Sequence, residues 1–300
     1  LFDALRTTYA DAEILGICSP ANAAIVRHHP AISDIIIVRN SASGLIDALG
    51  LLRRSFDLWV DPKAHRSTTS KLLLTILRYQ RAAATAENIP ILRRVTRIPS
   101  TSGHFIEGVN RAIEVLGLVG EEPRLRLALP QSLDVDAGRG AEVPGHVLIN
   151  LSTRTPGRRW KTRHWAGLIA NILKTTTYPI GLITVPSEAD FAKKLVTKAN
   201  NPRVYRQPTA SILEAAAFVR DAVLVVTPDT AIVHIAAVYD RPVLGLYAGD
   251  DDNLRRFAPL STIHEVVQAD DRQSISSIDL ASAIDAFGRL EMAFNESATT

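Results

Sequence analysis

Short apolar runs alternate with segments of helical periodicity along most of this 300-residue chain. In the first half, the apolar runs are sized for buried strands and occupy residues 13–18, 34–38 and 56–60. Patterns typical of helices run from Leu1 to Arg6 and over residues 20–26, 44–54, 68–81 and 103–116. Strands that alternate with helices predict a parallel sheet covered on both faces.

The second half repeats this alternation after a break. Residues 121–145 contain turn formers and charges without sustained periodicity, so we place the domain boundary there. Beyond the break, strands are expected at 146–151, 180–185, 204–205, 222–226, 242–247 and 265–267, and helices at 162–173, 188–199, 212–219, 229–238 and 278–290. We predict an α/β protein with a Rossmann-like, doubly wound domain over residues 1–130, a linker over 131–145 and a second such domain over 146–300.

Composition narrows the class of protein. With 46% hydrophobic and 22% charged residues, the chain suits an ordinary globular protein. Its single cysteine, Cys18, excludes an intramolecular disulfide and favours the cytoplasm, and no apolar run approaches the roughly 20 residues of a membrane span. Of the 34 basic residues 27 are arginines, but they are scattered, so we predict no nucleic-acid partner.

The turn after the predicted strand at 222–226 is the first candidate site. Pro228, Asp229 and Thr230 open the next helix, and the free N–H groups of a first helical turn form an anion site. His234 follows Thr230 by one turn on the same face, so both side chains can address one phosphate group. The alternative is that Asp229 and Thr230 cap the helix while His234 belongs to the core.

The loop after the strand at 146–151 is the second candidate. Ser152 and Thr153 supply hydroxyl groups, and Arg154, Arg158 and Arg159 supply the positive charge that binding of a diphosphate requires. A solvated basic loop is the alternative interpretation.

A third turn and an acidic run complete the candidates. Glu188 and Asp190 can accept hydrogen bonds from sugar hydroxyls, although acidic residues in a first helical turn also suit the helix dipole. The three consecutive carboxylates at 250–252 can bind a divalent cation, but they lack the spacing of a calcium loop, so we favour a solvated turn and predict no metal site. No dinucleotide-binding glycine motif, P-loop, zinc spacing or nucleophile elbow follows a predicted strand.

These residues together resemble a known family. Residues 227–237 read Thr-Pro-Asp-Thr-Ala-x-x-His-x-Ala-Ala and precede a Pro-Val strand, which resembles the signature of glycosyltransferase family 9, the heptosyltransferases. The segment Arg-Arg-Trp at 158–160 and the separate segment at 5–14 are also similar to parts of that family's sequences. The resemblance implies a GT-B fold, with the active site in a cleft between two Rossmann-like domains.

The resemblance also implies roles for individual residues. Asp229 would contact the donor sugar, while Thr230, Ala231 and His234 would hold the diphosphate. Ala231 stands where the family has glycine, which alters the approach of the backbone to phosphate.

Two further roles come from the other turns. Arg158 would replace the family's phosphate-facing lysine, which keeps the charge but changes its geometry, and Glu188 would contact the nucleotide or sugar. The family's presumed catalytic base is an aspartate after a first strand, which we expect upstream of Leu1. Asp3 is out of register with it and does not take that role.

The implied function is that of an inverting glycosyltransferase which needs neither a metal nor another cofactor. It would transfer heptose from ADP-heptose to a lipopolysaccharide core or a related lipid-linked surface glycan. Such an acceptor implies a cytoplasmic protein attached peripherally to the inner membrane. Two alternatives remain open: a non-catalytic subunit that binds sugar nucleotides or assists assembly, and a GT-B sugar-nucleotide epimerase or hydrolase.

Overall fold

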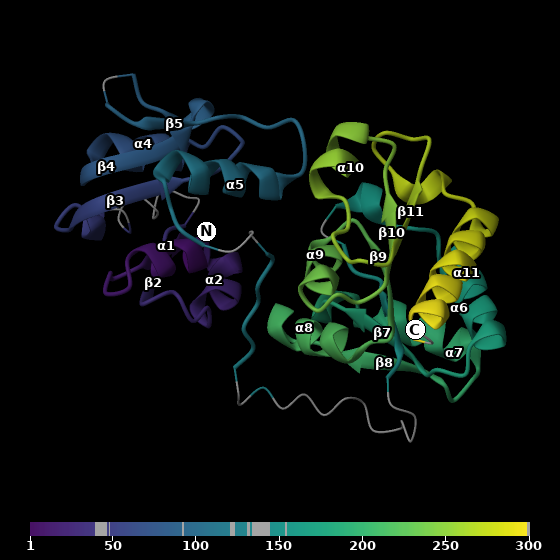
Figure 1. Cartoon of the computed structure of the whole chain (residues 1–300). Coiled ribbons are helices and arrows are strands. Elements are labelled where there is room, and N and C mark those ends of the chain that lie inside the picture. The colour runs from purple at the N-terminus through teal and green to yellow at the C-terminus, as the bar shows by residue number, and fades with distance from the viewer. Residues whose placement is uncertain are drawn as a thin grey trace. The chain divides into compact units, whose positions relative to one another are not determined.

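The computed structural model describes residues 1–39, 47, 49–91, 93–120, 124–130, 133, 145–153 and 155–298. The chain divides into two compact units, Leu1–Ala128 and Leu129–Thr300 (Figure 1). Of the predicted linker at 131–145, only Leu133 and Gly145 are among the described residues.

The first unit contains two parallel sheets, one of two strands and one of three. Its strands are β1 (Leu15–Cys18), β2 (Asp34–Ile37), β3 (Ser55–Asp61), β4 (Arg78–Thr85) and β5 (Thr96–Ile98). Its helices are α1 (Phe2–Thr8), α2 (Pro20–Arg27), α4 (Thr68–Ile76), the 3₁₀ turn η1 (Ala86–Asn88) and α5 (Phe105–Leu116). The helix predicted over 44–54 starts among residues that the structure does not describe.

Two strands of this unit were not predicted. The helix predicted over 68–81 is wrong over residues 77–81, because α4 ends at Ile76 and the chain enters β4 at Arg78. Residues 82–84 are three alanines, which favour helix intrinsically, but in the fold they are buried opposite Trp59, Val60 and Asp61 of β3. Tertiary pairing therefore overrides local propensity. The strand β5 has only three residues, too few for a periodic pattern.

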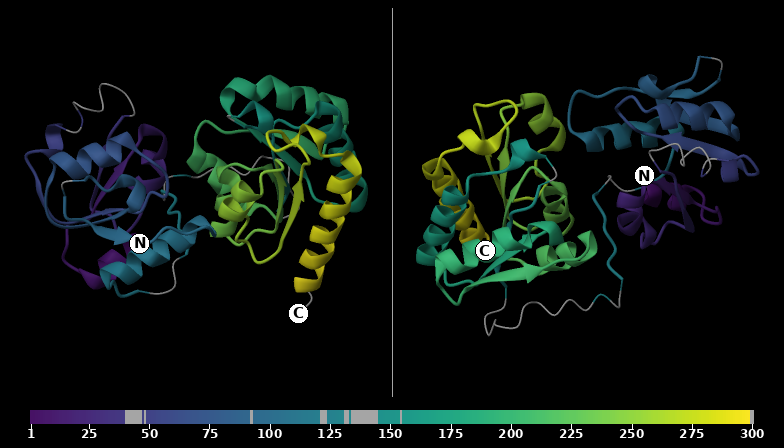
Figure 2. Two further views of the ribbon diagram at one scale, coloured as in Figure 1. Left: turned by 90° about the horizontal axis from the view of Figure 1, so that it is seen from above. Right: turned by 180° about the vertical axis from the view of Figure 1, so that it is seen from behind.

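The second unit is a six-stranded parallel sheet with helices on both faces (Figures 1 and 2). Its strands are β6 (Val147–Asn150), β7 (Ile180–Thr184), β8 (Val204–Pro208), β9 (Leu224–Pro228), β10 (Val243–Tyr247) and β11 (His264–Gln268). Its helices are η2 (Pro156–Arg158), α6 (Thr162–Thr175), η3 (Pro186–Glu188), α7 (Ala189–Ala199), α8 (Ile212–Asp221), α9 (Ala231–Val238), α10 (Asp251–Phe257), η4 (Ile275–Ser277) and α11 (Leu280–Ser297).

The strand order of this sheet locates the place where a ligand can bind. From one edge to the other the order is β8-β7-β6-β9-β10-β11, so the chain winds outward from β6 in one direction and then from β9 in the other. In such sheets the crevice lies at the carboxyl ends of the two strands where the winding reverses. Here those strands are β6 and β9, which pair directly with each other.

One side of this sheet supports the large core of the unit. The helices α6, α7 and α11 pack there around Trp165, Leu168 and Phe287, all of which are buried. Figure 1 shows α8 and α9 on the opposite face, where they contact each other. The indole of Trp160 donates a hydrogen bond to the Ile278 carbonyl over 2.9 Å, which ties the segment after η2 to the residues before α11.

The boundaries around the first candidate turn differ from those predicted. The strand expected at 222–226 lies at Leu224–Pro228, and the helix expected over 229–238 begins only at Ala231. Asp229 and Thr230 therefore belong to the turn, with Thr230 as the N-cap residue of α9. Within the described ranges, no helix has both the length and the apolar character that crossing a membrane requires.

Candidate functional site

A buried asparagine joins the two strands at the reversal of the sheet. Asn150, the last residue of β6, is only 4% exposed. Its Nδ2 donates hydrogen bonds to Thr227 Oγ1 over 3.0 Å and to Thr230 Oγ1 over 3.1 Å. Asn150 thereby fixes the position of the turn that contains Asp229 and Thr230. Sequence reasoning did not assign Asn150 a role, although its place at a strand's carboxyl end next to the predicted loop was the available signal.

The start of α9 presents the positive end of a helix dipole to a ligand. Thr230 caps the helix, because its Oγ1 accepts a hydrogen bond from the backbone N–H of Ile232 over 3.3 Å. Ala231 is exposed, so solvent reaches this first turn. Early N–H groups of a helix carry partial positive charge and favour an anion.

Asp229 receives two hydrogen bonds on one of its oxygens. The side chain is 7% exposed, and its Oδ2 lies 2.7 Å from an Nη atom of Arg158 and 2.8 Å from Nδ2 of Asn253. Arg158 ends η2 and is 35% exposed, so its guanidinium extends from a buried carboxylate toward solvent. The first two predicted turns are thus connected by an ion pair.

Asn253 belongs to α10, a helix that was not predicted. The acidic run expected as a turn forms the first turn of that helix instead, with Asp251 and Asp252 both exposed. Asp251 accepts a hydrogen bond from Gln268 over 3.0 Å, and Asp252 pairs with Arg255. In the described part of the chain, no group of three or more His, Cys, Asp and Glu side chains could hold a metal ion.

An uncharged tyrosine lies close to the Asp229 carboxylate. Burial raises the pKa of Tyr247 far above its ordinary value, Asp229 raises it further, and Arg158 partly opposes both. The Tyr247 hydroxyl donates to the carbonyl of Phe257 over 2.8 Å, which holds the end of α10 against β10. The phenyl ring of Phe257 in turn meets the ring of His234 edge-on, with centroids 6.2 Å apart. Tyr247 therefore holds α10 in place, and Phe257 packs against His234.

The hydroxyl groups of the second loop organise the loop itself. Ser152 Oγ accepts a hydrogen bond from the backbone N–H of Val185 over 2.6 Å, which joins the ends of β6 and β7. Thr153 Oγ1 accepts from the N–H of Thr155 over 3.2 Å. Both side chains are buried, and Arg154 lies outside the described residues.

The third predicted turn contacts the second through Glu188. Its Oε1 lies 2.9 Å from an Nη atom of Arg159, so the neighbouring arginines Arg158 and Arg159 pair with acidic residues of two different turns. The other oxygen, Oε2, is buried and has no hydrogen-bond partner among the residues described. Asp190 pairs instead with Lys193 on the exposed side of α7, so the structure does not bring it to this site.

The arrangement can neutralise an anion and accept hydrogen bonds from hydroxyl groups. Arg158 and the start of α9 offer positive charge, while Asp229 and Glu188 offer carboxylate oxygens. A ligand that carries both phosphate and several hydroxyl groups matches this set of side chains.

Comparisons with known proteins agree with these features. The model of glycosyltransferase family 9 (heptosyltransferase) matches residues 73–282, which is most of the chain. No curated protein sequence matches this chain.

Solved structures of similar fold cover nearly all of the chain. A family 9 glycosyltransferase from Veillonella parvula has 15% identity and a TM-score of 0.78, and the match covers 97% of this chain and 92% of that one. E. coli heptosyltransferase WaaC with ADP has 19% identity and a TM-score of 0.71, with coverage of 96% and 94%. E. coli ADP-heptose lps heptosyltransferase II has 15% identity and a TM-score of 0.72, with coverage of 98% and 93%.

These likenesses confirm the predicted α/β fold with parallel sheets, which is that of the GT-B heptosyltransferases. The family match extends from within α4 to the first residues of α11 and includes each of the three turns described above. The chain is a glycosyltransferase and belongs to glycosyltransferase family 9, the heptosyltransferases.

Proposed function

We propose that this glycosyltransferase transfers heptose from ADP-heptose, with inversion at the anomeric carbon, to the core of lipopolysaccharide or a related surface glycan. The observation that carries the donor assignment is the cluster of Arg158, Asp229 and Asn253 beside the start of α9. The description of the family as heptosyltransferases supports heptose as the donor sugar. The ADP named with the WaaC structure supports adenine as the donor base.

The donor's diphosphate would bind at the start of α9. Its charge would be shared by the positive end of α9 and by Arg158, whose guanidinium is the more exposed partner of its ion pair. Asp229 Oδ2 accepts from Arg158 and Asn253, and the carboxylate would accept hydrogen bonds from the hydroxyl groups of the sugar. Ala231 and His234 would complete the diphosphate site, and Glu188 would contact the nucleotide or sugar.

The chemical step requires charge to be stabilised on the departing group. An acceptor hydroxyl would attack the anomeric carbon and give its proton to a general base, while the bond from that carbon to the diphosphate breaks and the nucleoside diphosphate leaves with the bonding electrons. Arg158 and the amides of α9 would stabilise that charge without a metal or another cofactor. Dialysis against EDTA should therefore leave the rate unchanged, and a rate that is lost with EDTA and restored by a divalent cation would contradict this.

The decisive experiment is calorimetric titration with ADP, UDP, GDP and ADP-heptose. We expect binding of the adenine ligands alone, and a loss of ADP-heptose affinity in Asp229→Ala. The matched control is Asp221→Ala, because Asp221 also pairs with an arginine, Arg220, over 2.7 Å but lies at the end of α8. Preference for another nucleotide, or equal affinity in both variants, would overturn the donor assignment.

A transfer assay separates a transferase from the other proteins that use this fold. Incubation with ADP-heptose and purified lipopolysaccharide core should give ADP and extended glycan together. Release of free sugar without acceptor would indicate a hydrolase. Binding to vesicles of inner-membrane lipids would test the proposed peripheral location on the cytoplasmic face.

A further inference from the structure

The charges of the second unit are divided between two parts of its sequence. Residues 158–208 contain ten lysines and arginines but only two acidic residues, Glu188 and Asp190. Residues 209–300 contain fourteen acidic residues and six arginines. The first of these segments therefore carries a formal charge of +8 and the second a formal charge of −8, although the net charge of the whole chain is only +3.

The fold places these two segments at opposite edges of the sheet. The basic segment builds α6, β7, α7 and β8, and the acidic segment builds the elements from α8 to α11. Since the strand order is β8-β7-β6-β9-β10-β11, one edge strand belongs to the basic segment and the other to the acidic segment. The helix α7 contacts both β7 and β8 at the basic edge (Figure 1). The second unit is therefore electrically polarised along its sheet.

The lysines of α7 gather on one face of the helix. Asp190, Lys193, Lys194, Thr197 and Lys198 are spaced by three or four residues or are adjacent, and all five are exposed and border one shallow depression. The buried residues of the helix lie on its opposite face. Three of the seven lysines of the chain thus extend into solvent within two helical turns.

The positive charge of this face is only partly neutralised. Lys193 pairs with Asp190 over 3.0 Å. The hydrogen bond and charge of Lys193, followed by the charges of Lys194 and Arg206, hold the pKa of Asp190 below its ordinary value, so Arg206 of β8 lies near the same carboxylate. Lys194, Lys198 and Arg206 form no ion pair with any residue that the structure describes. We call Lys193, Lys194, Lys198 and Arg206 the α7 basic face.

The arginines of the acidic segment are in a different state. Four of the six form ion pairs with acidic residues of their own segment: Arg220, Arg255, Arg272 and Arg289. The unpaired positive charge of the second unit is therefore concentrated at the α7 edge rather than spread over its surface.

The chemistry of the α7 basic face favours a layer of anionic lipid headgroups over other polyanions. Lysine is a compact, strongly hydrated charge on a flexible chain, whereas the planar fork of arginine suits recognition of a single phosphate. The chain has 27 arginines, yet the basic residues of α7 are all lysines. None of the exposed residues of α7 is aromatic, so the face lacks a platform on which nucleic-acid bases could stack.

We propose that the α7 basic face docks the protein on the surface of an anionic phospholipid bilayer. This inference rests on the proposed function, whose lipid-linked acceptor places the reaction at such a surface. Each basic residue near an anionic membrane contributes roughly fivefold in affinity. The bilayer repels the acidic segment, so the protein docks with β8 toward the lipid and β11 away from it.

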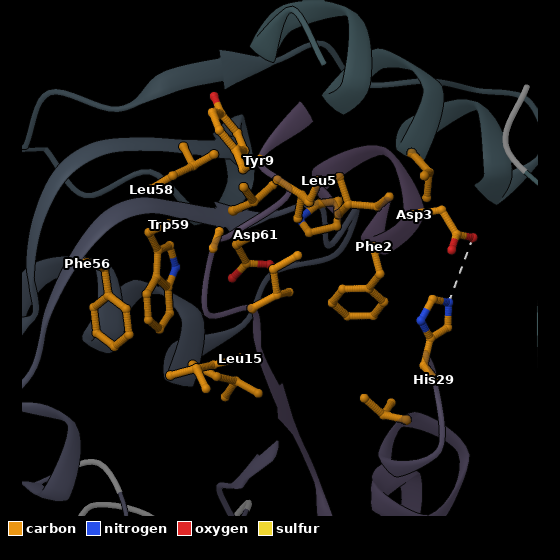
Figure 3. Close-up of a pocket in the computed structure, with 18 of the residues that line it drawn as sticks. Phe2, Asp3, Leu5, Tyr9, Leu15, His29, Phe56, Leu58, Trp59 and Asp61 are labelled. Carbon is orange, nitrogen blue, oxygen red and sulfur yellow. Dashed lines mark ion pairs between the residues drawn. The ribbon is translucent and has the colours of Figure 1, made fainter. Parts of the chain in front are cut away.

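The first unit contains a feature that would bind lipid in another way. It is a cavity of about 1330 Å³, and Figure 3 shows Phe2 and Leu5 of α1 with Phe56 and Leu58 of β3 around it. Contact through apolar side chains of this kind does not require a charged headgroup. Neutral lipid and high salt therefore separate the two modes of binding.

Sedimentation with vesicles tests the proposal on the unmodified chain. We expect binding to vesicles of phosphatidylglycerol and phosphatidylcholine, and none to vesicles of phosphatidylcholine alone. Binding should disappear in about 1 M salt, where the screening length falls to about 3 Å. Equal binding to both kinds of vesicle, or binding that survives this salt, would indicate apolar contact and overturn the proposal.

Two triple variants with the same net charge link the binding to α7. The combination of Lys193→Ala, Lys194→Ala and Lys198→Ala should bind anionic vesicles roughly 10- to 100-fold more weakly. The control combines Arg220→Ala, Arg272→Ala and Arg289→Ala, which also removes three positive charges, but from exposed arginines of the acidic segment. The control should bind like the unmodified chain. Equal weakening in the two variants would show that net charge alone decides the binding.

Acetylation of the unmodified chain gives a readout that does not depend on the folding of a variant. Anionic vesicles should protect Lys193, Lys194 and Lys198 from acetic anhydride several-fold and leave Lys71, which is exposed on α4 in the first unit, as reactive as before. Equal protection of Lys71, or no protection of the α7 lysines, would overturn the proposal. Neither readout involves a nucleotide, so loss of vesicle binding with intact ADP-heptose binding would overturn this proposal and leave the donor assignment standing.

Discussion

Arg158 is the residue of the proposed donor site that we expect to change partners when a donor binds. Its guanidinium neutralises Asp229 at 2.7 Å and is the more exposed of the two groups. A diphosphate beside α9 would compete for the same positive charge. The residue would then stabilise the leaving group in the transition state more than it stabilises the bound donor.

Replacement of Arg158 should therefore affect the rate more than the fold. In Arg158→Ala we expect kcat to fall by roughly 10²- to 10³-fold, as is typical when a preorganised donor to developing charge is removed. The measurement is the initial rate of ADP release with saturating ADP-heptose and acceptor. Arg220→Ala is the control, because it also breaks an arginine-aspartate pair. Equal rates in the two variants would contradict the assigned role.

Asn253 positions the carboxylate that we assign to the donor sugar. Loss of its 2.8 Å hydrogen bond to Asp229 in Asn253→Ala should weaken donor binding by roughly 1.5 to 3 kcal/mol, as for other hydrogen bonds to charged groups. The expected result is a higher KM for ADP-heptose and a smaller change in kcat. Gln268→Ala removes a similar amide-carboxylate bond, to Asp251 of the same helix, and should leave KM unchanged.

A buried histidine away from the site makes stability depend on pH. Burial lowers the pKa of His146 below the ordinary value of 6.5, and its Nε2 has no hydrogen-bond partner in the described part of the chain. Below about pH 6.5 the unfolded chain binds a proton that the folded chain does not bind, so stability falls as pH falls. Urea denaturation of wild type and His146→Gln at several pH values should show a shallower decline in the variant. Parallel declines would refute this assignment.

At the scale of elements, η2 packs against η4 and the residues just before it, which fixes the backbone that carries Arg158. Gly157 lies within η2 so close to the carbonyl oxygen of Gln273 that an added Cβ would overlap it. No side chain other than that of glycine fits there without a shift of one of the two segments. The position of the arginine therefore depends on the packing of a segment far along the chain.

Gly157→Ala should displace η2 and weaken donor binding. We expect a loss of about 1 to 3 kcal/mol in the free energy of unfolding, as for other overpacked sites, together with reduced affinity for ADP-heptose. Gly288→Ala in α11 is the control, because its added Cβ meets no atom within 4 Å and alanine favours helix by up to about 1 kcal/mol. Urea denaturation and calorimetric titration measure the two effects, and unchanged donor affinity would show that η2 does not position Arg158.

Elements with a strong local pattern could be predicted from the sequence, and those set by distant contacts could not. The strands at the centre of the second unit are continuous apolar runs because both faces are covered, and each was expected near its observed place. By contrast, β4 combines Arg78, Gln80 and Arg81 with three alanines, so it is a strand because of its pairing with β3 and β5. The helix α10 was missed because three adjacent aspartates read as a turn.

The same distinction holds for the candidate site. Thr230 could be predicted as a helix cap, since capping is a property of a few adjacent residues. The bonds from Arg158 and Asn253 to Asp229 join three segments that are far apart in the sequence, and no short pattern encodes them. The resemblance to family 9 supplied roles for Asp229 and Arg158, but not the pairing between them.

For the whole molecule, the donor site proposed here draws every one of its side chains from the second unit. Asp229, Arg158, Asn253 and Glu188 all lie within Leu129–Thr300. We therefore expect ADP to stabilise that unit directly, by about 2.7 kcal/mol at a free concentration of 100 times Kd. Hydrogen exchange with and without ADP should show slower exchange at the ends of β6 and β9, whereas β4 in the first unit should be unchanged. Calorimetric melting should show an ADP-dependent shift, which Asp229→Ala should reduce more than Asp221→Ala. If ADP protected β4 as strongly as β9, the first unit would have to contribute to nucleotide binding, and a donor site built from the second unit alone would be wrong.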